Sequence, residues 1–129
     1  MADTIRARFS VDEWLEAAGD SADAQAGVSR ATVRKKYTER LIGTAVAQII
    51  MTRNGDGAAY TAIERFEGTL DGEAGSISFL HGGIHAAAGD ESIGKVVPGS
   101  GAGVFSGALG KVELGRDDQG EFLDVVLDR

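Results

Sequence analysis

The chain has 129 residues, a hydrophobic fraction of 43% and 26% charged residues, which predicts one soluble domain with a single core over residues 1–129. No stretch approaches the roughly 18 apolar residues of a membrane span, and no apolar signal region begins the chain, so we expect a cytoplasmic protein that does not bind a membrane. The lack of cysteine excludes disulfides and thiolate sites, and the net charge of -7 argues against a nucleic-acid partner.

The first part of the chain predicts three strands. Residues 4–11 alternate between apolar and polar side chains, as expected for a half-buried strand, and residues 28–37 repeat this pattern. Residues 41–53 are apolar on both faces, which is typical of a strand covered on two sides. Residues 11–19 have room for about two helical turns, and the small, polar segment 19–27 predicts a loop.

Two hairpin turns follow. The sequence Asn54-Gly-Asp-Gly57 is the strongest turn signal, and Asp71-Gly72 supplies the positive φ angles of a second tight turn. Closing the first turn places Met51 opposite Tyr60. The same register gives three further pairs, which are Ile49 with Ala62, Ala47 with Glu64 and Ala45 with Phe66.

The last third predicts shorter and more irregular elements. Residues 82–91 indicate a weak strand that ends in a loop, and residues 93–97 a short strand stopped by Pro98. Residues 99–103 and 115–120 indicate turns, and residues 111–114 and 121–127 the last two strands. Roughly eight short strands without a long helix predict an all-β protein, an antiparallel barrel or sandwich.

Three familiar motifs are absent. The glycine-rich text before Lys111 lacks phosphate-loop spacing, because Phe105 stands where glycine is required and Val112 follows the lysine. His81 and His85 would lie about 13 Å apart on a strand, too far to bind one metal ion. No Gly-x-Ser-x-Gly elbow indicates a serine nucleophile. We therefore expect no metal.

One face of the second hairpin combines a carboxylate and an imidazole. A two-residue loop places Glu64 opposite Phe79 with His81 on the diagonal, whereas a four-residue loop places Glu64 directly opposite His81. Both registers leave Glu64 and His81 on one face, with Cβ atoms about 5 to 8 Å apart.

Glu64 and His81 are the candidate catalytic pair. Glu64 would act as general acid or base, His81 would orient it, and Tyr37 or Tyr60 would donate a proton. Burial should raise the pKa of Glu64 unless a cation or a hydrogen-bond donor contacts its carboxylate. The alternative is a structural pair of Glu64 with His81, or with an arginine such as Arg53, in a filled core.

Small side chains beside Glu64 would leave a ligand-sized hollow. The candidate ligand contacts are Tyr37, Ala45, Ala47, Ile49, Met51, Tyr60, Phe66, Phe79 and Trp14. Arg65 should face away from the hollow. The basic cluster at residues 34–36 is interpreted as a solvated face.

Several motifs together resemble a bacterial family of unknown function. They are residues 9–14 (FSVDEW), 59–72 (AYTAIERFEGTLDG), 75–81 (GSISFLH) and 96–103 (VVPGSGAG), followed by Leu109-Gly110. The resemblance implies the eight-stranded barrel of the allene-oxide-cyclase-like, or dirigent-like, type, with a central cavity, no cofactor and often an oligomer. It also favours a strand end followed by a loop after Val11. Relatives by fold steer the cyclisation or coupling of small molecules, and Glu64 and His81 fall on matching segments.

These observations leave two main functions open. The first is a cofactor-free cyclase or isomerase that acts on a hydrophobic small molecule in the cavity. The second is a barrel that binds such a molecule without chemistry. A filled barrel that works through its surface is a third interpretation. A homo-oligomer is an expectation that comes from the family resemblance alone.

Overall fold

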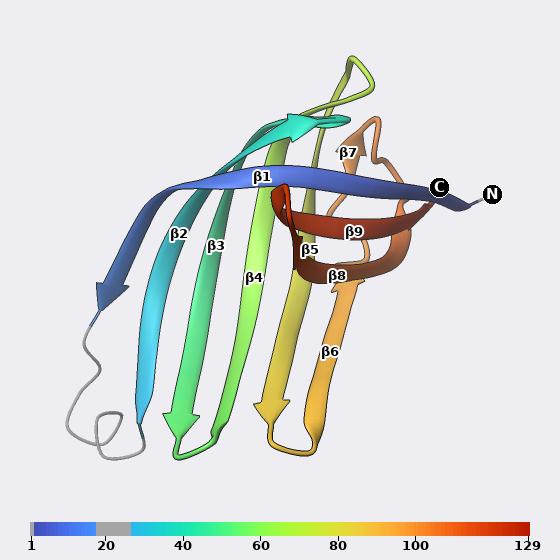
Figure 1. The fold of residues 1–129 in the computed structure, drawn as a ribbon. Coiled ribbons are helices and arrows are strands. Elements are labelled where there is room, and N and C mark those ends of the chain that lie inside the picture. The colour runs from blue at the N-terminus through green and yellow to red at the C-terminus, as the bar shows by residue number, and fades with distance from the viewer. Residues whose placement is uncertain (1, 18–26) are drawn as a thin grey trace.

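In the computed structural model of the chain, residues 2–17 and 27–129 are described, and they form one antiparallel sheet (Figure 1). The strands are β1 (Ala2–Ala17), β2 (Val28–Glu39), β3 (Leu41–Asn54), β4 (Gly57–Leu70), β5 (Glu73–Ala86), β6 (Gly89–Val96), β7 (Ala102–Gly103), β8 (Leu109–Asp117) and β9 (Gly120–Asp128). The expected all-β class is therefore confirmed.

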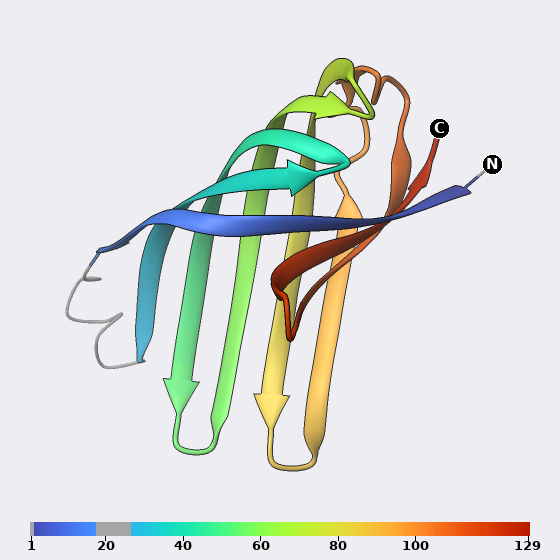
Figure 2. The same cartoon turned by 45° about the horizontal axis from the view of Figure 1, so that its top comes forward.

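Eight of the strands close into a barrel-like ring in the order β1-β2-β3-β4-β5-β6-β8-β9, and the short β7 adds to β5. Ala2 of β1 pairs with Asp128 of β9, so the two ends of the described chain lie together (Figures 1 and 2). The seam between β6 and β8 is narrow, because it rests on the single pair of Lys95 with Lys111.

The two predicted hairpins have the predicted register. The turn at Asp71 and Gly72 has φ angles of 50° and 89°, the left-handed conformation that a tight two-residue turn requires. Glu64 pairs with Phe79, so the hairpin has the two-residue loop and not the four-residue alternative. In the preceding hairpin Met51 pairs with Tyr60, and the other predicted pairs of β3 with β4 are confirmed as well.

Several predicted boundaries are wrong. β1 does not end at residue 11 but continues to Ala17 past a bulge between Val11 and Glu13, where the helical alternative was considered. The segment 82–91 is no weak strand with a loop, because β5 runs to Ala86 and turns directly into β6. β3, β4 and β5 each have 14 residues and are not short. The predicted loop at 19–27 lies almost wholly outside the described residues.

The two ends of the ring differ in how they are filled. At one end, large side chains from every strand of the ring and the loop after β7 form the main core, which includes Tyr37, Phe66, Phe79 and Phe105. A smaller buried cluster of Ala31, Val33 and Ala47 lies further along β2 and β3. Beyond it, the lower parts of β2 to β6 extend past β8 and β9 (Figures 1 and 2), and we call this the open end because a pocket lies between these strands.

Membrane insertion through a helix finds no support in the described ranges. None of their segments forms a helix with the length and apolarity needed to cross a bilayer.

Candidate functional site

A buried polar cluster lies between the filled and the open end of the ring. It consists of Lys35 and Tyr37 on β2, Glu64 on β4 and His81 on β5, and we call these four residues the buried polar cluster. Alternation along each strand turns them inward. Glu64 is 0% exposed, His81 1% and Lys35 5%, although charged side chains are almost never buried to this degree unless they are paired.

Glu64 is the centre of the cluster. Its Oε1 accepts hydrogen bonds from Lys35 Nζ at 2.7 Å and from His81 Nε2 at 2.8 Å, and its Oε2 accepts one from Tyr37 Oη at 2.5 Å. Lys35 Nζ also lies 4.2 Å from the centre of the Phe9 ring. No buried side-chain nitrogen or oxygen of the described residues lacks a partner.

The donors decide the charge of Glu64. Burial alone would raise the pKa of this carboxyl, but hydrogen bonds from His81 and Lys35, together with the Lys35 charge and the Tyr37 hydroxyl, lower it to about 2. The sequence predicted a raised pKa for Glu64 only if no cation or hydrogen-bond donor contacted the carboxylate. Three donors contact it, and its pKa is lowered. Burial, and then the Glu64 charge, raise the pKa of Tyr37 well above its ordinary value, so this phenol stays neutral.

A hydrogen-bond chain leads from Glu64 toward the open end. Because the ionised carboxylate accepts from His81 Nε2, that nitrogen carries a proton. His81 Nδ1 lies 3.0 Å from the hydroxyl of Tyr60. A neutral His81 therefore accepts a hydrogen bond from Tyr60, and a protonated His81 donates one to it. Burial, and then the Glu64 charge, raise the pKa of Tyr60 to about 12.

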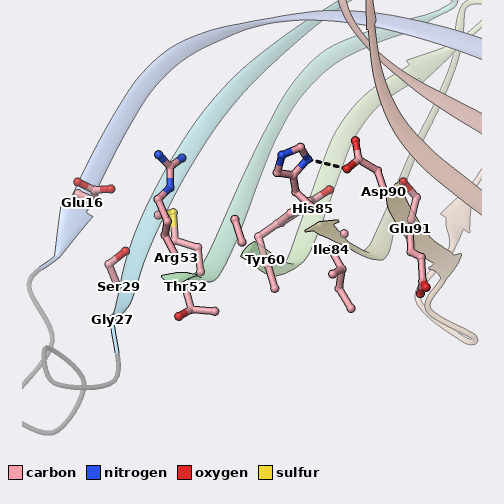
Figure 3. Close-up of a pocket in the computed structure, with 15 residues that line it drawn as sticks. Glu16, Gly27, Ser29, Thr52, Arg53, Tyr60, Ile84, His85, Asp90 and Glu91 are labelled. Carbon is pink, nitrogen blue, oxygen red and sulfur yellow. Dashed lines mark hydrogen bonds and ion pairs between the residues drawn. The ribbon is translucent and has the colours of Figure 1, made fainter. Parts of the chain in front are cut away.

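Tyr60 also lines a pocket of about 510 Å³ at the open end, which we call the mouth pocket (Figure 3). This volume is within the usual range of small-molecule sites. Strands β1 to β6 supply its walls. The lining residues are Glu16, Gly27, Ser29, Met51, Thr52, Arg53, Ala58, Ala59, Tyr60, Gly83, Ile84, His85, Asp90, Glu91 and Ser92.

Gly83 makes room for the ring of Tyr60. The two residues are paired across β4 and β5, and a Cβ atom on Gly83 would lie 3.2 Å from Tyr60 Cε1. His85 and Asp90 close the neighbouring wall, because His85 Nδ1 lies 2.6 Å from Asp90 Oδ1.

The structure brings together only part of the predicted site. Glu64, His81, Tyr37 and Tyr60 are linked by hydrogen bonds, and Met51 and Tyr60 line the mouth pocket. The predicted hollow beside Glu64 is occupied by other side chains: Ala45, Phe66 and Phe79 lie in the main core and Ala47 in the smaller buried cluster, with Ile49 packed against it. Trp14 is 49% exposed and is not among the pocket residues.

Lys35 is the residue that the sequence interpretation missed. The cluster at 34–36 was interpreted as a solvated face, which is correct for Arg34 and Lys36 and wrong for Lys35. The signal was present, because alternation from Val33 through Lys35 to Tyr37 places all three side chains on one face. Arg53 is exposed and does not pair with Glu64, whereas Arg65 faces outward as predicted.

Comparison with known proteins gives a family and a fold. Residues 5–128 match the family described as "Protein of unknown function (DUF3224)". The chain belongs to the DUF3224 family. A crystal structure of a DUF3224 protein of unknown function from Shewanella oneidensis has a TM-score of 0.85 and 23% sequence identity, over 99% of this chain and 97% of that one. Comparison with curated proteins found no match. The predicted membership of a family of unknown function is confirmed.

The geometry allows proton transfer at the mouth pocket. A phenol at the pocket wall, an imidazole behind it and a buried carboxylate behind the imidazole repeat the order of hydroxyl, histidine and carboxylate that activates hydroxyl groups in hydrolases. Here Lys35 and Tyr37 add further donors, which hold the carboxylate in its charged form.

Proposed function

We propose that this member of the DUF3224 family is a cofactor-free isomerase or cyclase that moves protons on a hydrophobic small molecule held in the mouth pocket. The observation that carries the proposal is the continuous hydrogen-bond chain from Tyr60 through His81 to Glu64, because its outer end lines the pocket and its inner end is a buried carboxylate.

The hydrogen-bond chain can carry a proton from the ligand to His81 and back again. With His81 neutral, the Tyr60 oxygen takes a proton from the ligand while its own proton moves to His81 Nδ1. The imidazolium that forms is stabilised by Glu64, which lies 2.8 Å from Nε2. In reverse, the Tyr60 hydroxyl delivers a proton to another ligand atom. Tyr60 is thus the residue that touches the ligand, and His81 and Glu64 act through it.

The walls suit an apolar ligand. Met51, Ala58, Gly83 and Ile84 contribute aliphatic or small surface, and polar side chains gather at the strand ends. Sites of this kind combine apolar walls with a few polar groups that fix the orientation of the ligand.

The test is conversion at constant mass. Isomerisation and cyclisation rearrange atoms without adding any, so chromatography coupled to mass spectrometry should show a new peak of unchanged mass. The wild type and Tyr60→Phe are incubated with a panel of apolar epoxides, polyenes and β,γ-unsaturated ketones. We expect conversion that falls about 10²-fold or more in Tyr60→Phe, the typical contribution of a general acid or base. Equal conversion by both proteins would refute the proposal.

A second candidate is a ligand-binding barrel without chemistry. The three hydrogen bonds that Glu64 accepts favour this function, because a buried carboxylate with three donors can also be a purely structural ion pair. This function predicts that panel compounds bind to the wild type and to Tyr60→Phe alike, measured by calorimetry, and that neither protein changes their chromatographic peak.

Three finer expectations stay predictions. The family resemblance implies the allene-oxide-cyclase-like type of the ring and a homo-oligomeric state, and the sequence composition suggests a cytoplasmic location.

A further inference from the structure

We propose that the substrate is an enolisable carbonyl compound with an acidified α-carbon, and that Arg53 binds its carbonyl oxygen while Tyr60 removes the α-proton. This inference rests on the proposed function and specifies its substrate class. Its reaction is a 1,3-proton shift between carbon and oxygen, or between two carbons through the enol.

Proton transfer in the mouth pocket converges on one atom, the hydroxyl oxygen of Tyr60. Among the described residues that line the pocket, only Tyr60 is hydrogen-bonded to His81, and His81 in turn contacts Glu64. A single relay that accepts and returns one proton on one side of a ligand suits a shift between neighbouring atoms of that ligand. Such a shift needs no second acid and no oxidant.

Arg53 lies near Tyr60 at the pocket wall. It is paired with Ala58 across β3 and β4, and Ala58 precedes Tyr60 by two residues on the same face of β4. Both Arg53 and Tyr60 line the mouth pocket (Figure 3). The side chain of Arg53 makes no hydrogen bond or ion pair with any described residue. A guanidinium so placed can donate to an oxygen on which negative charge develops.

The other charged side chains of the pocket suit this role less well. His85 and Asp90 bind each other at 2.6 Å. Glu16 and Glu91 are carboxylates, which repel an enolate oxygen and leave Arg53 as the cationic group of the lining. The oxygen of the substrate therefore binds toward Arg53, and its α-carbon faces Tyr60.

The step balances within the substrate and the relay. The α C–H bond breaks and its proton forms an O–H bond with Tyr60, while the original hydroxyl proton of Tyr60 moves to His81 Nδ1. The electron pair of the C–H bond becomes the C=C bond of the enolate, and the carbonyl π pair moves to the oxygen held by Arg53. Tyr60 then returns a proton to the carbonyl oxygen, or to the second carbon when the shift is between two carbons. This step completes the shift and regenerates neutral His81. Nothing is oxidised or reduced.

The experiment follows hydrogen exchange at carbon. Ethyl 2-methylacetoacetate carries one α-proton between two carbonyl groups, and its loss in D₂O is followed by proton NMR with and without protein. We expect protein-dependent exchange that prefers one enantiomer, because a buffer ion does not distinguish enantiomers and a protein pocket does. Tyr60→Phe should lower the protein-dependent rate about 10²-fold, and Arg53→Gln should lower it roughly 10-fold or more.

Arg65→Gln is the matched control, since Arg65 is an exposed arginine on the outer face of β4 and should exchange as the wild type does. Thermal melting confirms that each variant is folded. Exchange by Tyr60→Phe or Arg53→Gln at the wild-type rate would overturn the inference. Tyr60-dependent conversion of an epoxide or polyene without any exchange of the keto ester would overturn it too, and leave the proposed function standing. If neither conversion nor exchange depends on Tyr60, both fail.

Discussion

Replacing Glu64 should destabilise the protein mainly because of Lys35. Glu64→Gln removes the negative charge but leaves the ammonium of Lys35 buried at 5% exposure, next to the ring of Phe9. Removing one partner of a buried ion pair typically costs about 3–5 kcal/mol. The pKa of Glu64 gives a similar figure, since its fall from 4.5 to about 2 corresponds to roughly 3 kcal/mol of preference for the charged form. We therefore expect the free energy of unfolding to fall by about 3–5 kcal/mol.

A double-mutant cycle separates this cause from simple loss of packing. Lys35→Met alone leaves Glu64 with His81 and Tyr37 as donors and should cost less than Glu64→Gln. The double variant Lys35→Met/Glu64→Gln should recover part of the loss, because no uncompensated charge remains, with a coupling energy of about 1–3 kcal/mol. Urea denaturation followed by circular dichroism measures all four proteins. Fluorescence is less suitable, because the single tryptophan, Trp14, is 49% exposed in the folded state.

The control is Glu67→Gln on the same strand. Glu67 is exposed, and its contact with Arg65 spans 3.4 Å at the surface, so its loss should change stability by less than about 0.5 kcal/mol. A cost for Glu64→Gln no larger than that of Glu67→Gln would refute the reasoning, and so would a double variant as unstable as the two single changes added together.

Three further predictions concern pH, the relay and the backbone. The pKa of Glu64 is depressed in the folded state, so its contribution to stability is complete above about pH 4.5 and is lost as the pH falls toward 2. As the pH is lowered from 6 to 2, the urea midpoint should therefore fall more steeply for the wild type than for Lys35→Met/Glu64→Gln. Parallel curves for the two proteins would contradict this prediction. Tyr60→Phe should cost only about 1 kcal/mol of stability, the usual value of one hydrogen bond, and a much larger loss in thermal or urea melts would make Tyr60 a structural residue. Gly68→Ala should lower the free energy of unfolding by about 1–3 kcal/mol, because the new Cβ would clash with the carbonyl of Ile42 in β3. Gly57→Ala is the control, since its Cβ would meet only ordinary contacts at 3.6 Å or more. Equal melting temperatures for the two variants would contradict the expected clash.

The hairpins were predictable because their turns constrain the chain locally. Asp71-Gly72 and, within Asn54–Gly57, Gly55-Asp56 form two-residue turns, and a two-residue turn determines every pair along both strands. That register alone places Glu64 and His81 on one face. The turn between β5 and β6 had no such signal, because Ala87 and Ala88 stand at its centre, and the prediction therefore broke one hairpin into a loop and a separate strand.

The pocket depended on contacts that nearest-neighbour pairing does not give. Closure of the ring brings Glu16 of β1 and Asp90 of β6 to the same pocket, although no ladder joins these strands. Lys35 was missed for another reason: the three consecutive basic residues were interpreted as one solvated face, although the alternation of residues 28–37 places Lys35 on the same face as Val33 and Tyr37. Small residues beside Glu64 predicted a hollow, but the long side chain of Lys35, paired with Ala45, reaches Glu64 there.

The contrast between the filled and the open end of the ring also matters for engineering. Each of the long strands β3, β4 and β5 contributes to the core at one end and to the mouth pocket at the other. Changes near Met51 and Ala58 should therefore alter which molecules fit, with little effect on the residues that determine thermal stability. If the mouth pocket binds its ligand as proposed, selectivity and stability depend on opposite ends of the same strands, and libraries confined to the open end should yield many folded variants.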